Sequence, residues 1–184
     1  MITERSQAGF DRLLVSALER GLPGGAGGVS IEPVAALDGI GHTRIVVLTV
    51  SSYLFRLMAI LYFTPDAATR ACFARAAGAS APELADEAFH DRVAECGNVC
   101  CGTLNRELAR HFPHVGMSTP NIIDRDCMRY VDLLGCGLMR HYRLALADGP
   151  TMHASLCVAD FGLVDFHADA SVDEDVSAGE LEMF

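Results

Sequence analysis

Asp91-Arg-Val-Ala-Glu-Cys-Gly-Asn-Val-Cys-Cys-Gly102 is the stretch that decides how this 184-residue chain is interpreted. We predict that it forms the middle of a long helix, from about residue 83 to about residue 111. At about 100° per residue, its apolar residues recur three or four positions apart, which is typical of a helix with one buried side. The predicted buried side carries Phe89, Val93, Cys96, Cys100, Leu104 and Leu108. The predicted exposed side carries Asp91, Glu95, Asn98, Gly102, Asn105 and Arg106.

The exposed side of this helix holds the candidate functional residues. Glu95 and Asn98 are three positions apart, so their side chains lie next to each other. Gly97 and Gly102 fall inside the helix, where each Gly costs about 1 kcal/mol relative to Ala. Close approach of another chain to the backbone is one reason to keep such glycines. An exposed Glu and Asn one turn apart are usually a solvated helix face, so this spacing alone does not establish a site.

Length and charge point to one folded domain with an acidic end. The net charge is −10, and seven acidic residues fall between positions 165 and 184, which hold no Lys or Arg. The rest of the chain is therefore only mildly acidic and lacks the clustered cations that nucleic-acid binding needs. We predict a domain over residues 1–166 and a solvated acidic tail over residues 167–184, with a docking role for the tail left open.

Cysteine usage and the apolar segments favour a cytoplasmic protein. The seven cysteines are odd in number and lack framework spacing, and the start of the chain has no signal-peptide pattern. Residues 44–63 are apolar enough to suggest a membrane span, but Arg56 lies in their middle. Ser51-Ser52-Tyr53 divides them into two strand-length halves rich in β-branched or aromatic residues. We predict a hairpin of strands 43–50 and 54–63, and no contact with a membrane.

The elements around the hairpin follow from caps and turn residues. Thr3 or Ser6 is expected to cap a first helix, residues 21–28 form a loop without the Lys-Ser/Thr end of a phosphate-binding loop, and a strand covers about 29–36. Thr64 is expected to cap a helix that runs to about Ala77. Gly78 is expected to end that helix.

The second half of the chain predicts the long helix and further strands. Ser80 or Pro82 is expected to open the long helix, and residues 111–113 to end it. Residues 116–123 read as an edge strand or irregular segment because of Pro120. Strands are expected at 133–147 and 152–159, separated by a turn at 148–150, with 161–166 as a continuation. The result is an α+β fold: a largely antiparallel sheet with long helices packed on one side.

The central stretch resembles a known signature. Ala94-Glu-Cys-Gly-Asn-Val-Cys-Cys-Gly102 is similar to the signature helix of the CheC/CheX/FliY chemotaxis phosphatase family: Glu, two residues, Asn, three residues, Gly. Glu95, Asn98 and Gly102 match it in place. Val115-Gly-Met-Ser-Thr-Pro-Asn-Ile-Ile123 resembles the extended segment that follows that helix in the family. The resemblance covers roughly residues 5–165, and the single copy of the motif is similar to single-site CheX.

The resemblance implies a function for this helix. Such a protein would remove the aspartyl phosphate of a phosphorylated CheY-like receiver, with Asn98 positioning the attacking water and Glu95 pairing with the receiver's lysine. The receiver would hold Mg²⁺, and this chain would bind no cofactor or metal of its own. The other predicted partner-contact residues are Asp91, Gly97, Gly102, Asn105 and Arg106. The resemblance also implies a homodimer joined edge to edge through its sheets.

Other interpretations of the sequence remain open. Cys96, Cys100 and Cys101, together with His90, could hold a metal, but zinc prefers thiolates from two separate segments, and only Cys101 is expected to point off the apolar face. A hydrolase lacks support because there is no G-x-S-x-G motif, and His141 and His153, even if they face each other, read as ordinary strand residues. The main alternative is a non-catalytic receiver-binding or scaffold dimer of the same fold.

Overall fold

The computed structural model describes residues 1–25, 27–78, 84–147 and 149–168. In chain order the elements are α1 (Glu4–Gly21), β1 (Val29–Val34), β2 (Arg44–Ser51), β3 (Phe55–Phe63), α2 (Ala67–Ala76), α3 (Asp86–Ala109), β4 (Gly116–Met117), β5 (Asn121–Asp124), the 3-10 helix η1 (Arg125–Leu134), β6 (Leu138–Leu146) and β7 (Thr151–Asp160). This order confirms the predicted α+β fold, and η1 is an addition to it.

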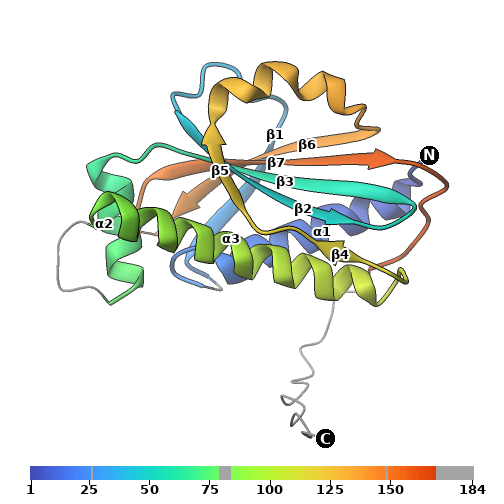
Figure 1. Cartoon of the computed structure of the whole chain (residues 1–184), viewed down its shortest axis with the longest axis horizontal. Coiled ribbons are helices and arrows are strands. Elements are labelled where there is room, and N and C mark those ends of the chain that lie inside the picture. The colour runs from blue at the N-terminus through green and yellow to red at the C-terminus, as the bar shows by residue number, and fades with distance from the viewer. Residues whose placement is uncertain (26, 79–83, 148, 169–184) are drawn as a thin grey trace, which may run out of the picture.

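The strands form one antiparallel sheet in the order β1-β6-β7-β3-β2-β4, with β5 also paired to β2 (Figure 1). The predicted hairpin is confirmed, because β2 and β3 pair in register from Arg44↔Phe63 to Ser51↔Arg56. The segment around Pro120 forms two short strands along the outer side of β2, as expected of an edge. β1 pairs with β6 alone among the described strands and forms the opposite edge.

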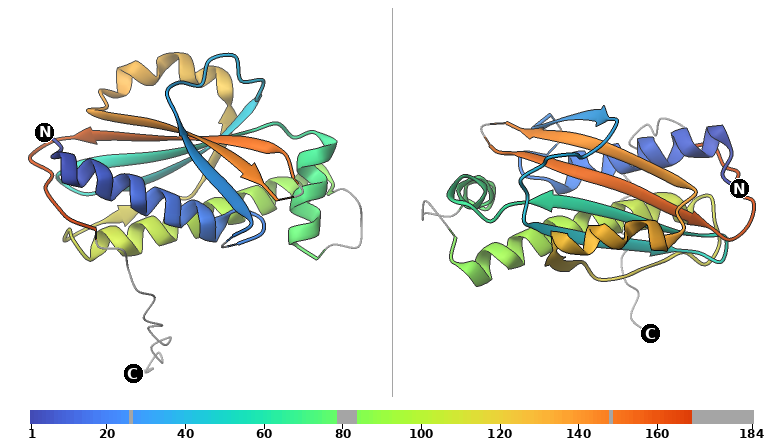
Figure 2. Two further views of the ribbon diagram at one scale, coloured as in Figure 1. Left: turned by 180° about the vertical axis from the view of Figure 1, so that it is seen from behind. Right: turned by 90° about the horizontal axis from the view of Figure 1, so that it is seen from above.

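The sheet has a thick layer of helices on one face and a thinner cover on the other. α1 and α3 lie across one face, and η1 lies on the opposite side (Figures 1 and 2). Alternate residues of β3 separate accordingly: Phe55 and Leu57 join the core under α1 and α3, whereas Met58 and Ile60 join a smaller cluster. Burial on both faces explains why β3 is apolar without interruption from Leu57 to Phe63.

Of the two predicted helix caps, one is confirmed and the other is wrong. Thr3 caps α1, and its hydroxyl accepts a hydrogen bond from the Ser6 backbone N–H. The prediction that Thr64 caps α2 is wrong. Asp66 caps it instead, accepting a 2.9 Å hydrogen bond from the Thr69 backbone N–H, and the helix begins at Ala67. The Thr64 hydroxyl lies 3.4 Å from Nδ1 of His42 instead.

The predicted strand start at Leu133 is also wrong. Residues 125–134 form η1, which ends at Gly135 with φ 61°, and the strand begins only at Leu138. Met128, Val131 and Leu134 recur every third residue, the period of a 3-10 helix, and pack on the smaller cluster. The strand was predicted from Leu133 because apolar and polar residues alternate in part from that point on.

Two further boundaries differ from prediction. Residues 161–166 do not continue β7: Val164 makes only an isolated bridge to Ile2, and Phe166 packs edge-on against Phe10 at 4.9 Å between ring centroids. The long helix begins at Asp86 and ends at Ala109. Three parts of the prediction lie outside the described residues: the opening of the long helix at Ser80 or Pro82, Asp148 of the predicted turn, and residues 169–184 of the predicted tail. No helix in the described ranges is long and apolar enough to cross a membrane.

Candidate functional site

The two candidate catalytic side chains lie on the outer side of α3. Glu95 and Asn98 are both exposed. Three residues along a helix correspond to a rise of about 4.5 Å, so the two side chains sit one turn apart on the same side. Within the described part of the chain, neither side chain has a hydrogen-bond or ion-pair partner. A carboxylate and a carboxamide are therefore both available to another molecule.

The first turn of α3 is held in place by α2. The Arg70 guanidinium donates hydrogen bonds to the Leu84 carbonyl at 3.0 Å and to Asp86 Oδ1 at 2.5 Å. It also lies 4.9 Å from the centre of the Phe89 ring. Asp86 also stabilises the helix directly, because a carboxylate in the first turn interacts favourably with the helix dipole. These contacts substitute for a side-chain cap, since the N-cap residue Ala85 supplies none.

The middle of α3 is fixed against the sheet edge. Gly97 is buried, and a Cβ placed there would lie 3.0 Å from Cδ2 of Leu48 and 3.1 Å from Pro120. One turn later, the Cys101 thiol is 3.7 Å from the carbonyl oxygens of Thr49 and Ser118. The predicted contact of Gly97 with a partner is therefore wrong, because Gly97 allows the chain's own sheet, rather than another molecule, to approach the helix.

The remaining predicted partner-contact residues lie on or near the outer side. Asp91 is exposed, and Gly102 is half-buried with nothing within 4 Å of the position a Cβ would take. Arg106 is exposed and lies 3.5 Å from Glu107. Asn105 is half-buried, and its Oδ1 is buried without a hydrogen-bond partner in the described structure. The helix therefore exposes Asp91 and Arg106 on the same side as Glu95 and Asn98, whereas Gly102 and Asn105 are only partly exposed there.

The thiols of α3 behave as apolar side chains. Burial raises the pKa of Cys96 to about 11 and that of Cys100 to about 12. Cys101 was expected to point off the apolar face, but it is fully buried, and burial raises its pKa too. All seven cysteines are free thiols, and no group of three or more His, Cys, Asp or Glu among the described residues is arranged to hold a metal ion.

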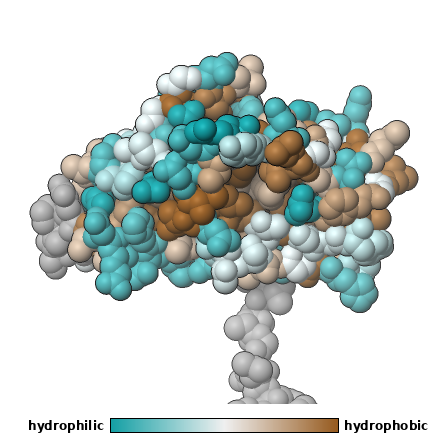
Figure 3. Space-filling view, turned by 45° about the horizontal axis from the view of Figure 1, so that its top comes forward, coloured by the Kyte–Doolittle hydropathy of each residue, from teal (hydrophilic) through white to brown (hydrophobic). Residues whose placement is uncertain are grey.

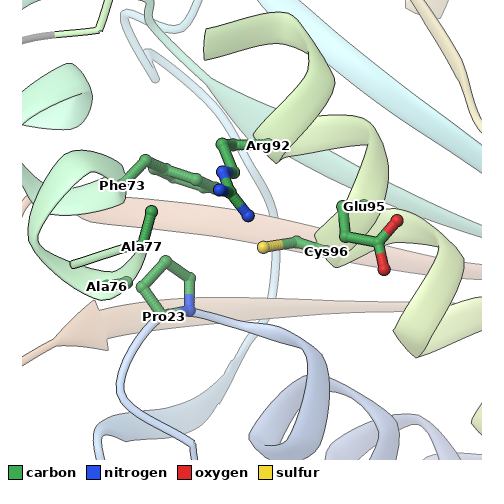
Figure 4. Close-up of a pocket in the computed structure, with 7 residues that line it drawn as sticks. All are labelled: Pro23, Phe73, Ala76, Ala77, Arg92, Glu95 and Cys96. Carbon is green, nitrogen blue, oxygen red and sulfur yellow. The ribbon is translucent and has the colours of Figure 1, made fainter. Parts of the chain in front are cut away.

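A depression and a cavity formed by described residues lie beside Glu95. One is a shallow depression of about 450 Å³ lined by Ala88, Asp91, Arg92 and Glu95. The other is a cavity of about 100 Å³ between α2, α3 and the loop after α1, lined by Pro23, Phe73, Ala76, Ala77, Arg92, Glu95 and Cys96 (Figure 4). The Cys96 sulfur and the Arg92 side chain point into this cavity, whereas the Glu95 carboxylate points away from it at the rim.

Sequence reasoning missed this cavity, because its lining comes from three separate segments. Pro23 follows α1, Phe73 lies on α2, and Arg92 lies on α3. No motif links these residues, and only the packing of α2 against α3 brings them together. Elsewhere the outer surface is mixed: Figure 3 shows separate apolar patches among hydrophilic side chains.

Substitution by Ala is expected to have opposite effects on stability at the two interior glycines of α3. Gly102→Ala should raise the free energy of unfolding by about 0.5–1 kcal/mol, because Ala is the better helix residue and the added Cβ meets nothing. Gly97→Ala brings the same gain in helix propensity, but its Cβ would crowd Leu48 and Pro120. This overpacking is expected to lower the free energy of unfolding by about 1–3 kcal/mol. Urea denaturation of both variants measures the difference. Equal stabilisation by the two substitutions would contradict this packing.

His42, His141 and His153 lie on the other face of the sheet, where they are satisfied by local hydrogen bonds. His141 Nδ1 is 2.8 Å from the Ser155 hydroxyl, and His153 Nδ1 is 2.8 Å from Nε2 of His42. His141 and His153 therefore do not pair with each other, and their interpretation as ordinary strand residues is confirmed. The sheet separates them from Glu95 and Asn98.

Acid is expected to destabilise the protein through the His42–His153 pair. Burial, with smaller contributions from His153 and Arg125, lowers the pKa of His42 from 6.5 to about 4. The unfolded chain therefore takes up the proton first, so this stability is fully present above about pH 6.5 and is lost as the pH falls towards 4. Since His42 is only half-buried, we expect a loss of about 1–2 kcal/mol.

Urea denaturation between pH 7 and pH 4.5 measures this effect. The carboxylates also titrate at acidic pH, so the wild-type protein is compared with His42→Gln, which cannot take up the proton. The variant should lose about 1–2 kcal/mol less over this range than the wild type does. Parallel stability profiles for the two proteins would rule out His42 as the source.

Comparisons with known proteins identify the fold. No protein-family model and no curated protein matches the sequence. Among solved structures, chemotaxis protein CheX of Vibrio vulnificus is 16% identical, with a TM-score of 0.61, covering 82% of this chain and 99% of that one. CheX of Borrelia burgdorferi, solved in complex with CheY, BeF₃ and Mg²⁺, is 14% identical, with a TM-score of 0.61 over 82% of this chain and 98% of that one.

A third structure, FliY of Thermotoga maritima, is 13% identical, with a TM-score of 0.52 over 85% of this chain and 91% of that one. The chain thus has the fold of the CheX, CheC-like and FliY proteins along most of its length. The fold implied by the signature in α3 is confirmed.

Proposed function

We propose that this protein is a phosphatase that removes the aspartyl phosphate of a CheY-like receiver domain. The observation that carries the proposal is the pair Glu95 and Asn98: both are exposed and unpartnered within the described chain, on a helix fixed against the sheet. Two facts support it. The pair matches the family's Glu-x-x-Asn spacing, and one structure with this fold is a CheX–CheY complex.

Asn98 is the water-positioning residue in this proposal. Hydrolysis of an acyl phosphate needs a water in line with the bond that breaks, more than it needs a strong base. A carboxamide both donates and accepts hydrogen bonds, so it can orient that water without changing its own charge. Holding the water in an attack geometry is a large part of what an enzyme can contribute to such a reaction.

Glu95 is the docking residue. Its carboxylate is proposed to pair with the lysine that accompanies the phosphorylated aspartate of a receiver, while Asn98 lies one turn further along α3. Asp91, Gly102, Asn105 and Arg106 surround the pair and are proposed to contact the receiver. This chain is proposed to bind no cofactor itself, and the receiver supplies the Mg²⁺ that offsets the charge of the phosphoryl group.

The proposal also concerns assembly and location. We propose a homodimer that pairs sheet edges, for which β1 offers an edge with one described neighbour. Sedimentation analysis tests it, and a monomer at micromolar concentration would contradict it. A cytoplasmic location is proposed because all seven thiols are free, as a reducing compartment favours.

The direct test is the decay of phosphorylated receivers from the same genome. Each receiver is phosphorylated, freed of donor and followed with Mg²⁺ present, with and without the protein. Accelerated loss of phosphate from at least one receiver is expected. Binding of a receiver without any acceleration would contradict the phosphatase and identify a non-catalytic receiver-binding dimer of the same fold.

A further inference from the structure

We propose that the cavity between α2 and α3 receives one apolar side chain of the receiver, on the side of the receiver's lysine that lies away from the aspartyl phosphate. This inference rests on the proposed function and adds a second anchor to it. The cavity has a volume of about 100 Å³, which suits a single side chain better than a metabolite, since ligand pockets usually measure about 300–1,000 Å³.

The position of the cavity around α3 carries the argument. At about 100° per residue, Asn98 lies about 60° to one side of Glu95, and Arg92 lies about 60° to the other side. Cys96 lies further round on the side of Arg92. Glu95 therefore stands between the water-positioning amide and the cavity. A receiver whose lysine reaches Glu95 and whose phosphate faces Asn98 has the cavity on the far side of its lysine, within reach of the residues next to that lysine.

The lining of the cavity gives the chemistry of the occupant. Pro23, Phe73 and Ala77 supply apolar walls, and the Cys96 thiol that points inward is protonated at neutral pH because burial raises its pKa to about 11 (Figure 4). The Arg92 side chain also points inward, and the remaining lining favours an aliphatic or aromatic side chain. Buried apolar anchors of this kind supply much of the binding energy in protein interfaces.

The charges at the rim indicate what accompanies that side chain. The adjoining depression of about 450 Å³ shares Arg92 and Glu95 with the cavity and adds the Asp91 carboxylate. Two carboxylates against one guanidinium leave this rim negative, which complements a lysine. The predicted occupant is thus a receiver segment in which an apolar residue lies beside the lysine, rather than a free apolar molecule.

Ala76→Leu tests the cavity, because Ala76 lines it and is exposed, so a larger residue fills the cavity without entering the core. Ala68→Leu is the matched control: the same change at an exposed position two turns away on α2 and outside the cavity lining. Leu is nearly as good a helix residue as Ala, so both variants should fold. Affinity for the receiver is measured with Mg²⁺ and BeF₃⁻ present, and receiver dephosphorylation is measured separately.

We expect Ala76→Leu to weaken binding at least about tenfold and Ala68→Leu to stay within about twofold of wild type. Equal affinity of Ala76→Leu and wild type overturns the inference, even if wild type accelerates dephosphorylation. A loss of self-association in Ala76→Leu with unchanged receiver binding also overturns it and assigns the cavity to a second copy. Weakened receiver binding without any turnover by wild type supports the cavity while removing the phosphatase proposal.

Discussion

Asn98→Ala is expected to lower the acceleration of receiver dephosphorylation at least about 100-fold. The physical reason is that a carboxamide on a fixed helix holds a water in line with the bond that breaks, and misplacing a reacting group by about 1 Å can cost about 100-fold. Because Asn98 is exposed and has no partner in the described chain, its removal should leave the fold intact. The measurement is the rate of phosphate loss from the receiver at saturating protein, with Mg²⁺ present.

Two controls make this result specific to water positioning. Binding of Asn98→Ala to a receiver loaded with Mg²⁺ and BeF₃⁻ should stay within several-fold of wild type, so that the loss appears in turnover rather than in docking. Asn98→Gln keeps the amide but lengthens the side chain by one methylene, and is expected to recover little activity. If Asn98→Ala dephosphorylated the receiver as fast as the wild type, the water would be positioned by another group.

Glu95→Gln is expected to weaken receiver binding by about 30-fold or more. Removing one partner of a desolvated charge pair costs about 2–5 kcal/mol, since the other charge is left buried without its counterpart. The substitution keeps the shape of the side chain and removes only its charge. Titration of the loaded receiver measures the dissociation constant.

Glu4→Gln is the matched control, because it removes an exposed carboxylate from the first turn of α1, outside the proposed docking surface. It should leave receiver affinity within about twofold. A similar loss of affinity in both variants would show that overall charge, rather than a specific pair at Glu95, governs binding. An unchanged affinity in Glu95→Gln would remove Glu95 from the docking surface.

The sequence predicted the elements whose pattern is local and repeated. The apolar period of α3 identified its buried side, and the β2–β3 hairpin followed from two β-rich runs divided by Ser51-Ser52-Tyr53. The signature of Glu95 and Asn98 predicted the candidate site on the exposed side of α3. These predictions succeed because the spacing of residues along one element determines which side they share.

The predictions that failed depend on contacts between elements. Gly97 was expected to face a partner, but the position of Pro120 at the sheet edge determines that it packs internally. Residues 125–132 of η1 were assigned to no element, and only its last two residues were taken for the start of a strand, because the burial of Met128, Val131 and Leu134 depends on their packing against the second face of the sheet. The cavity beside Glu95 is lined by residues from three separate segments, so no single stretch of sequence predicts it.

Multiple turnover of a phosphorylated receiver tests the central claim most directly. The receiver is supplied at about twentyfold molar excess over the protein, with Mg²⁺ present and no phosphodonor, and the remaining phosphoreceiver is followed over time. The proposed phosphatase predicts that all of the receiver loses its phosphate faster than in buffer, in wild type and not in Asn98→Ala. Decay at the buffer rate, despite binding of the receiver, would contradict the claim.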